Sequence, residues 1–255
     1  MEIKDVLFVL KDSSLENKTR NILSDLDINA TYKIKEKITK EDFSKKDLIV
    51  SIGGDGTFLS AAHFVLNHPI IGVNSDERNS EGALTSITLE KLKEKLLEIF
   101  NKKFIIKSYT RENVRIIKKD QCIQTELALN EAYLGNINPH HPSNYILTIK
   151  DKIEKQRSSG IVISTGTGLT AWYNAMGGKP FNREDKLIKF KVREPYHGRI
   201  HNVELVEGQI AENEVIILES LMNHGLVAVD SIRTYELQEG DKIEISIGNQ
   251  LNVIQ

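Results

Sequence analysis

The chain has 255 residues, of which 40% are hydrophobic and 27% are charged. This balance is ordinary for a globular protein, so a largely disordered chain is excluded, and the length allows one large domain or two smaller ones. Its 34 basic and 36 acidic residues leave a net charge of −2, which provides no overall positive field to hold a nucleic acid. We therefore expect no nucleic-acid partner.

The first residues carry two acids, Glu2 and Asp5, where a targeting segment would be basic, and the apolar run that follows is short. No apolar stretch approaches the roughly 18 residues that a membrane helix needs. The single cysteine, Cys122, cannot form an internal disulfide, which fits a reducing compartment. These features predict a cytoplasmic chain without a leader and without a membrane partner.

In about the first hundred residues, β-rich runs alternate with helical patterns. The β-rich runs cover 6–10, 30–35, 47–52 and 70–73, and the helical patterns cover 15–26, 58–66 and 89–100. Strands that alternate with helices are typical of a parallel sheet. The sequence therefore predicts an α/β domain, which we assign to residues 1–101.

Beyond residue 102 the pattern changes to β-rich runs with a single helix near 168–176. The β-rich runs cover 104–109, 114–118, 127–134, 145–149, 160–164, 187–192, 202–206, 215–218, 226–229 and 242–247. A hairpin turn is expected at 150–152. We predict a mostly β domain over residues 102–232 and a ligand-binding cleft between the two domains.

One β-rich run ends in Gly53-Gly54-Asp55-Gly56-Thr57, where a helical pattern begins. Glycines in such a turn let backbone N–H groups approach a phosphate, and the carboxyl end of a parallel strand is where α/β sheets bind ligands. The glycine spacing and the absence of a following lysine exclude the P-loop and the dinucleotide fingerprint. Asp55 is the leading catalytic candidate, although a tight turn with a helix-capping aspartate would use the same residues.

The Gly-Gly-Asp-Gly-Thr loop resembles the motif shared by NAD kinases, by diacylglycerol and sphingosine kinases and, more distantly, by phosphofructokinases. Two further segments, Asn130-Glu131 and the run from Ser158 to Trp172, occur in the order and at the separations typical of NAD kinases. The resemblance extends to Val229-Asp230-Ser231 and so covers nearly the whole chain. It implies a Rossmann-like N-terminal α/β domain, a mostly β C-terminal domain, and a last segment, residues 233–255, that returns to the first lobe.

The resemblance also implies roles for individual residues. Asp55 corresponds to the proposed base for the 2′-hydroxyl of the adenosine ribose of NAD, and Asn130 and Glu131 correspond to the pair that holds the NAD nucleosides. Substrate binding is implied for Gly53, Gly54, Gly56, Thr57, Phe58, Asn74, Arg78, Asn130, Glu131, Ser159, Thr167, Thr170, Ala171, Trp172 and Asp230. Arg78 could clamp a phosphate from its loop, or it could simply be solvent-exposed.

Several positions depart from the commonest bacterial pattern of that family. Ser159-Gly160 stands in place of Asp-Gly, Thr165-Gly166 in place of Thr-Pro, and Ala171-Trp172 in place of Ala-Tyr. These variants look more like the mitochondrial-type branch. Because a serine lacks the charge and reach of a carboxylate, Ser159 predicts weaker discrimination at the nicotinamide end of the substrate.

The sequence thus predicts a phosphotransferase that makes NADP from NAD and ATP, with Mg²⁺ accompanying ATP and with the chain assembled as a homodimer or homotetramer. No metal-ligating set of the protein itself is expected, because His140 and His141 lie between two prolines without a third ligand. Two alternatives remain open. One is a lipid kinase, which would need an apolar acceptor channel, and the other is a non-catalytic dinucleotide-binding sensor.

Overall fold

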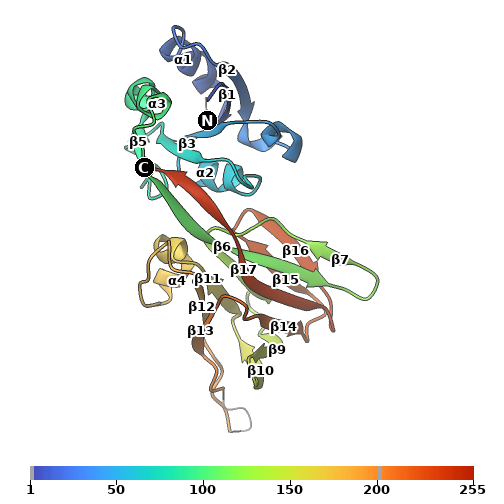
Figure 1. Ribbon diagram of the computed structural model, residues 1–255. Helices are drawn as coiled ribbons and strands as arrows, with labels where there is room; N and C mark the ends of the chain where they lie inside the picture. The colour runs from blue at the N-terminus through green and yellow to red at the C-terminus, as the bar shows by residue number, and fades with distance from the viewer. Residues whose placement is uncertain (1–2, 200–202) are drawn as a thin grey trace. The chain divides into compact units, whose positions relative to one another are not determined.

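The computed structural model describes residues 3–199 and 203–255. The chain divides into two compact units, which are described separately below. Unit 1 comprises Met1–Ser108 and Leu251–Gln255, and unit 2 comprises Tyr109–Gln250. Two long strands, β6 (Ile106–Ile117) and β17 (Lys242–Ile254), contribute residues to both units, and they lie side by side as the green and red arrows of Figure 1.

Unit 1 is built on a parallel sheet with the strand order β2-β1-β3-β4. Its strands are β1 (Asp5–Leu10), β2 (Asn29–Ile34), β3 (Leu48–Gly53), β4 (Ile70–Asn74) and the short β5 (Ile87–Thr88). The end of β17 joins this sheet parallel to β4, where Val253 pairs with Ile70. Every residue of β3 is buried, as expected for a central parallel strand that is covered on both faces.

Three α-helices connect the strands of unit 1, namely α1 (Ser14–Ile22), α2 (Asp55–Ala62) and α3 (Leu92–Phe100). Short 3₁₀ turns lie at Lys35–Lys37, Lys40–Phe43 and Leu89–Lys91. Helix α3 buries Leu92, Leu96 and Ile99, which lie on one face because residues three and four apart are neighbours on a helix. These side chains pack with the strands in one hydrophobic cluster.

Unit 2 consists of two mostly antiparallel sheets. One contains β7 (Cys122–Gln124), β6, β17, β14 (Ile216–Ser220), β9 (Ser143–Ile149) and β10 (Lys152–Ser158). The other has the order β13 (Glu207–Ala211), β12 (Leu187–Val192), β11 (Ile161–Ser164), β8 (Glu131–Asn136), β15 (Gly225–Val229) and β16 (Arg233–Leu237). A 3₁₀ turn, η4 (Thr167–Thr170), and a single helical turn, α4 (Trp172–Ala175), follow β11.

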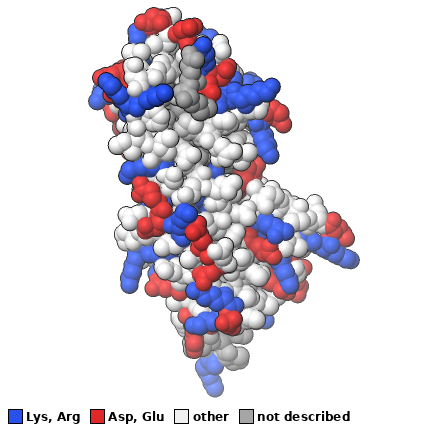
Figure 2. Space-filling model, in the orientation of Figure 1, with Lys and Arg blue, Asp and Glu red and all other residues white. Residues whose placement is uncertain are grey.

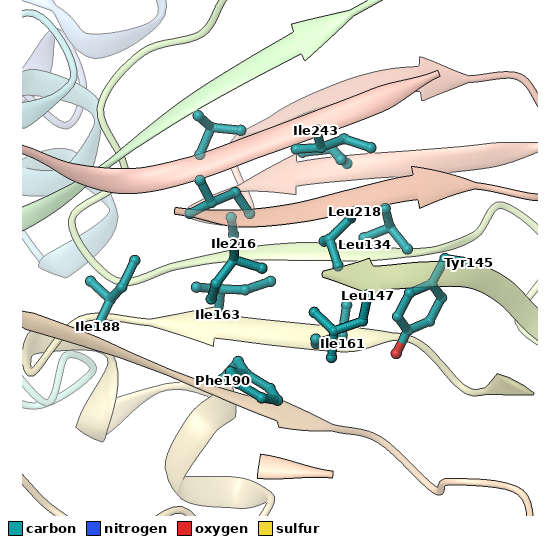
Figure 3. Packing of buried hydrophobic residues seen from close by; sticks show 14 of the residues in the cluster. Leu134, Tyr145, Leu147, Ile161, Ile163, Ile188, Phe190, Ile216, Leu218 and Ile243 are labelled. Carbon is teal, nitrogen blue, oxygen red and sulfur yellow. The ribbon is translucent and has the colours of Figure 1, made fainter. Parts of the chain in front are cut away.

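The two sheets of unit 2 enclose a continuous hydrophobic core. Figure 3 shows Ile163 of β11 and Ile216 of β14 pointing into the space between the sheets, beside Leu218 and Leu147. All four side chains are fully buried. Alternating burial along β9 and β14 shows the same arrangement, with one face of each strand in the core.

The predicted fold class, an α/β domain followed by a mostly β domain, is confirmed. The strand predicted at 202–206 is wrong: Asn202 lies outside the described residues, residues 203–206 form no strand, and the strand of this region is β13. The runs predicted at 104–109 and 114–118 form one strand, β6. In the part of the chain that the structure describes, five strands match none of the predicted β-rich runs, namely β5, β7, β10, β13 and β16. The division into units also differs from the expected one, because only the last five residues join unit 1.

Candidate functional site

The glycine loop of unit 1 joins β3 directly to α2. A Cβ on Gly53 would lie 2.3 Å from Thr57 Oγ1, and one on Gly54 would lie 2.5 Å from Ser80 Oγ, so glycine at these positions permits close packing. A Cβ on Gly56 would meet nothing within 4 Å. The loop is therefore closed behind Gly53 and open beside Gly56, at the first turn of α2. Helix geometry leaves the N–H groups of Asp55 and Gly56 without an acceptor inside α2, whereas those of Thr57 and Phe58 donate to the Gly54 carbonyl at 3.0 and 3.2 Å.

Asp55 is held by the chain that follows β4. Its Oδ1 accepts a hydrogen bond from the backbone N–H of Leu84 at 2.8 Å, and its Oδ2 accepts one from the N–H of Ala83 at 3.1 Å. The carboxylate is half-buried and has one orientation fixed by these two donors. Since each carboxylate oxygen can accept more than one hydrogen bond, both keep the capacity to accept a proton or a hydroxyl.

The other predicted residues of unit 1 fall into two groups. Asn74 ends β4 opposite Gly53, and the backbone N–H of Ser75 donates to the Gly53 carbonyl at 3.1 Å, so the predicted residues Gly53, Asp55 and Asn74 do come together. Arg78 is exposed on the following loop. Phe58 is fully buried in unit 1, so its side chain serves packing of α2 and reaches no ligand in this conformation.

In unit 2, the predicted motifs meet where three neighbouring strands reach the same edge of a sheet. Strand β8 begins with Glu131, which pairs with Ser164 at the end of β11, and β15 ends with Val229, which pairs with Ala132. Because the three strands are antiparallel, the start of β8 and the ends of its two neighbours share one edge. The spacing of the motifs along the chain therefore brings them together in space.

Asp230 fixes the backbone that precedes β8. Its carboxylate accepts hydrogen bonds from the N–H groups of Leu129, Asn130 and Glu131 at 2.8, 2.7 and 3.1 Å. Asp230 itself has a φ of 50°, an uncommon conformation for a residue with a side chain, which points to a functional constraint at this turn. Asp230 thus positions the Asn130-Glu131 pair from behind.

Thr167 lies at the same site because the backbone of the turn η4 closely approaches the backbone of Asn130. A Cβ on Gly168 would lie 2.6 Å from the carbonyl oxygen of Asn130, and the N–H of Thr165 donates to that oxygen at 2.9 Å. The turn η4 is therefore packed directly on the start of β8. Thr170 is exposed at its end and Ala171 is half-buried, so these two predicted residues lie on the outer side of the turn.

Three predicted residues of unit 2 carry buried polar atoms without a hydrogen-bond partner within the described part of the chain. They are Asn130 Oδ1, Glu131 Oε2 and Thr167 Oγ1. Their residues are between 0% and 8% exposed. A buried polar atom without a partner costs about 1–3 kcal/mol, so each such atom in a folded protein calls for an explanation, and a ligand is one.

Two charged residues that sequence analysis missed lie beside this pair. Arg111 and Glu112 of β6 are fully buried. Burial, and then the charges of Asp230 and Glu131, raise the pKa of Glu112 well above its usual range. Burial lowers the pKa of Arg111 to about 10, against the opposing effect of Asp230.

Glu131 belongs to the same group of charges. Burial, and then the charge of Asp230, raise the pKa of Glu131 to about 8. Asp230, Glu131 and Glu112 thus form a group of three carboxyl groups beside Asn130. The raised pKa values mean that not all three carry a negative charge at neutral pH. A hydroxyl donor from a ligand would stabilise the ionised form of Glu131.

Ser159 lies near the other end of β11. Its hydroxyl donates to the carboxylate of Glu194, a residue that sequence analysis also missed, and its carbonyl accepts a hydrogen bond from the Tyr133 hydroxyl at 2.9 Å. Trp172 packs edge-on against Tyr133, with ring centroids 4.9 Å apart. The structure therefore brings Ser159 and Trp172 to one region through Tyr133.

The missed residues gave little signal in the sequence. Arg111-Glu112 interrupts an apolar pattern and was assigned to a break between two strands, and Glu194 lies in a polar loop after β12.

On the face that Figure 2 shows, blue and red side chains are interspersed. Among the described residues, no helix has both the length and the apolar character to span a bilayer.

Comparisons with known proteins agree with this architecture. A sequence profile described as the ATP-NAD kinase N-terminal domain matches residues 4–104. An NAD kinase of Teredinibacter turnerae is 29% identical over 260 residues, which is 96% of this chain and 82% of the relative.

Two solved structures are similar in fold. Yeast NADH kinase complexed with NADH gives a TM-score of 0.86 at 18% identity and matches 100% of this chain and 84% of its own. An NAD kinase from Archaeoglobus fulgidus in complex with ATP gives a TM-score of 0.78 at 18% identity, over 98% of this chain and 93% of its own. Because both identities are low, these likenesses concern the fold.

Proposed function

We propose that the chain belongs to the NAD kinase family and that it transfers the γ-phosphoryl group of ATP to the 2′-hydroxyl of the adenosine ribose of NAD, which makes NADP. The family profile covers the glycine loop, and the relative from Teredinibacter turnerae matches both units. The solved relatives were obtained with NADH and with ATP, respectively. These are the two classes of substrate that the proposed reaction joins.

The observation that carries the proposal is the set of buried polar atoms without partners at the strand ends of unit 2. Asn130 Oδ1 is an acceptor, Glu131 Oε2 is an acceptor when the carboxyl is ionised, and Thr167 Oγ1 can donate or accept. The hydroxyls and exocyclic amines of a nucleoside donate hydrogen bonds and would satisfy these acceptors. A lipid kinase would need an apolar channel in their place, which argues against that alternative.

We assign the proton transfer to Asp55. The 2′-hydroxyl donates its proton to the carboxylate while its oxygen bonds to the γ-phosphorus, and the bond from that phosphorus to the oxygen bridging to the β-phosphate breaks, so that ADP leaves. The N–H groups of Ala83 and Leu84 hold the carboxylate in one orientation for this step. General-base catalysis of this kind contributes roughly 10²–10⁴-fold in rate.

The glycine loop would meet the phosphates. A Cβ on Gly56 would meet nothing within 4 Å, and the N–H groups of Asp55 and Gly56 have no acceptor inside α2, which suits oxygen atoms that carry negative charge. We propose that Mg²⁺ enters on the triphosphate as part of that substrate, where it would offset the phosphate charge. Within residues 3–199 and 203–255, no three His, Cys, Asp or Glu side chains gather into a metal-binding group.

The cellular location and the oligomeric state of the protein are also part of what we propose. We propose that the protein acts in the cytoplasm, where Cys122 would stay reduced, and as a homodimer or homotetramer. Light scattering after size exclusion would measure the assembly directly.

The deciding experiment is a turnover assay with matched acceptors. Purified protein is incubated with MgATP and NAD, and NADP is measured with an NADP-specific dehydrogenase, while parallel reactions omit NAD or replace it with diacylglycerol or sphingosine. We expect NADP only in the complete reaction, and much slower formation of NADP when Asp55 is replaced. Binding of NAD without NADP formation would establish the sensor, and phosphorylation of a lipid would establish the lipid kinase.

A further inference from the structure

A cavity of about 470 Å³ opens in unit 2 beside α4. Trp172, Met176, Arg193 and Glu194 are among the residues that line it. Trp172 is 40% exposed, and the guanidinium carbon of Arg193 lies 5.6 Å from the centroid of its ring. An aromatic wall with a few polar groups at its edge suits a planar heteroaromatic ring.

Glu194 lines this cavity and a neighbouring one. It also lines a second cavity, of about 270 Å³, together with Ser159, so it stands between the two spaces. Its φ is 45°, a conformation that costs free energy for a residue with a side chain and that clusters at functional sites. Within the described residues, the polar partner of its carboxylate is the hydroxyl of Ser159.

The cavity is connected to the Asn130-Glu131 site by one strand. Ser164 at the end of β11 pairs with Glu131, and Ser159 lies five positions earlier, just before β11 begins, which is at most about 16 Å at 3.3 Å per residue. Tyr133, two positions after Glu131 on β8, touches Trp172 and donates to the Ser159 carbonyl. A substrate with two ring systems joined by a flexible diphosphate could therefore occupy both places on the same sheet.

We propose that Glu194 supplies the carboxylate that position 159 lacks, and that Glu194 and Trp172 bind the nicotinamide ring and favour its oxidised, positively charged form. This inference rests on the proposed function and deepens it. A carboxylate and an aromatic face both attract a cationic ring, whereas the reduced ring is neutral and gains neither interaction. Arg193 opposes the effect because its own positive charge lies against Trp172, so it limits the preference for the cationic ring.

This assignment reverses the expectation drawn from Ser159 alone. With serine at this position and no other acid, discrimination would be weak, and an aspartate would restore it. With Glu194 in contact with Ser159, an aspartate at 159 would bring two like charges together, and one of them would have to take up a proton or move away.

The kinetic test compares wild type, Glu194→Gln, Ser159→Ala and Ser159→Asp. For each, kcat/KM is measured with NAD and with NADH at saturating MgATP. We expect Glu194→Gln, which keeps the shape and loses the charge, to lower the NAD-to-NADH ratio about fivefold to tenfold. Ser159→Ala should lower it by about twofold, and Ser159→Asp should not raise it.

An unchanged ratio in Glu194→Gln, or a higher ratio in Ser159→Asp, would overturn the assignment. Either result would leave NAD phosphorylation by the wild type intact, so the proposed function and this inference fail separately.

A binding measurement that needs no turnover completes the test. Trp172 is the single tryptophan of the chain, so intrinsic fluorescence reports on this cavity alone. NAD should quench Trp172 in a saturable way, whereas ADP-ribose, which shares the adenosine and diphosphate but lacks nicotinamide, should quench it much less. In Glu194→Gln the NAD titration should shift to higher concentration, and equal quenching by NAD and ADP-ribose would place the nicotinamide elsewhere.

Discussion

The glycine loop of unit 1 and the Asn130-Glu131 site of unit 2 differ in whether their polar side-chain atoms have hydrogen-bond partners. In the loop, both oxygens of Asp55 accept backbone hydrogen bonds. In unit 2, Asp230 satisfies three backbone N–H groups, yet Asn130 Oδ1, Glu131 Oε2 and Thr167 Oγ1 are buried without a partner in the described chain. Both oxygens of Asp55 thus have hydrogen-bond partners without a ligand, whereas the three buried polar atoms of the unit 2 site do not.

This difference fits the two roles that we propose for these sites. A group that removes a proton gains from a fixed orientation before the substrate arrives, because no reorganisation is then needed during the reaction. A group that selects an acceptor gains from polar atoms whose cost is recovered only when the correct substrate binds, since a ligand without the matching hydroxyls leaves them unpaired. Ligand binding should therefore stabilise unit 2 more than unit 1.

The largest expected effect is at Asp55. Asp55→Asn keeps the shape of the side chain but removes the basic carboxylate, so kcat should fall at least about a hundredfold while NAD affinity changes little. Steady-state kinetics with NAD and ATP would measure both quantities. A near-normal kcat in this variant would refute the assignment of Asp55 as the base.

The hydrogen bonds of Asp55 call for a control on stability. An asparagine offers one acceptor oxygen, so one of the N–H groups of Ala83 and Leu84 loses its partner, at about 1–3 kcal/mol. Urea unfolding of Asp55→Asn should show this loss. If NAD stabilises the variant as much as it stabilises wild type, the missing activity reflects chemistry and not misfolding.

The second prediction concerns the acceptor site. Glu131→Ala should weaken NAD use by about 1–3 kcal/mol, read from kcat/KM, and should leave the KM for ATP largely unchanged, because Glu131 should accept hydrogen bonds from ribose hydroxyls. The matched variant Glu131→Gln keeps the volume and isolates the charge. Equal losses for NAD and ATP would indicate a structural role for Glu131 and would weaken the contrast between the two sites.

The third prediction follows from the raised pKa of Glu131, about 8, caused by burial and by Asp230. If the carboxylate form binds ribose, kcat/KM for NAD should rise about tenfold between pH 7 and pH 9, since roughly a tenth of the free enzyme carries the charge at pH 7. Glu131→Gln should lose this slope. A wild-type profile that is flat over the same range would contradict the role of the ionised form.

Folding stability should show the opposite trend. Because the pKa of Glu131 is higher in the folded chain than its ordinary value of 4.5, its neutral form contributes stability that is fully present below pH 4.5 and is lost as the pH rises through 8. The difference in free energy of unfolding between wild type and Glu131→Gln should therefore fall over this window. Urea titrations at pH 5, 6.5 and 8 would measure it.

Much of this arrangement could be predicted from local signals. The alternation before residue 102 identified β1 to β4 and their helices, and the glycine loop, Asn130-Glu131 and Ser158–Trp172 marked the site, because parallel strands and glycine turns leave clear patterns. Strand pairing then placed Glu131, Ser164 and Asp230 at one sheet edge. That step needs pairing between segments about 30 and 100 residues apart.

The charged residues behind the site could not be predicted in this way. Arg111-Glu112 reads as a solvent-exposed break, since charged residues are rarely buried, and only the tertiary structure of β6 makes it core. Glu194 depends on the contact with Ser159, 35 positions away, which no local pattern encodes. The strand expected at 202–206 is also wrong, because Val203 and Leu205 pack against the core of unit 2 although residues 203–206 form no strand.

The smallest expected effect tests the glycine loop itself, by comparing two glycines three positions apart. A Cβ on Gly53 would lie 2.3 Å from Thr57 Oγ1, so Gly53→Ala should lower the free energy of unfolding and reduce activity with both substrates. A Cβ on Gly56 would meet nothing, and alanine is the better helix former by about 1 kcal/mol, so Gly56→Ala should fold at least as stably as wild type. If phosphates approach the N–H groups there, the added methyl should still raise the KM for ATP a few-fold without changing the KM for NAD. Unfolding curves and the two KM values measure this, and a Gly56→Ala variant with an unchanged KM for ATP would move the phosphates away from the first turn of α2.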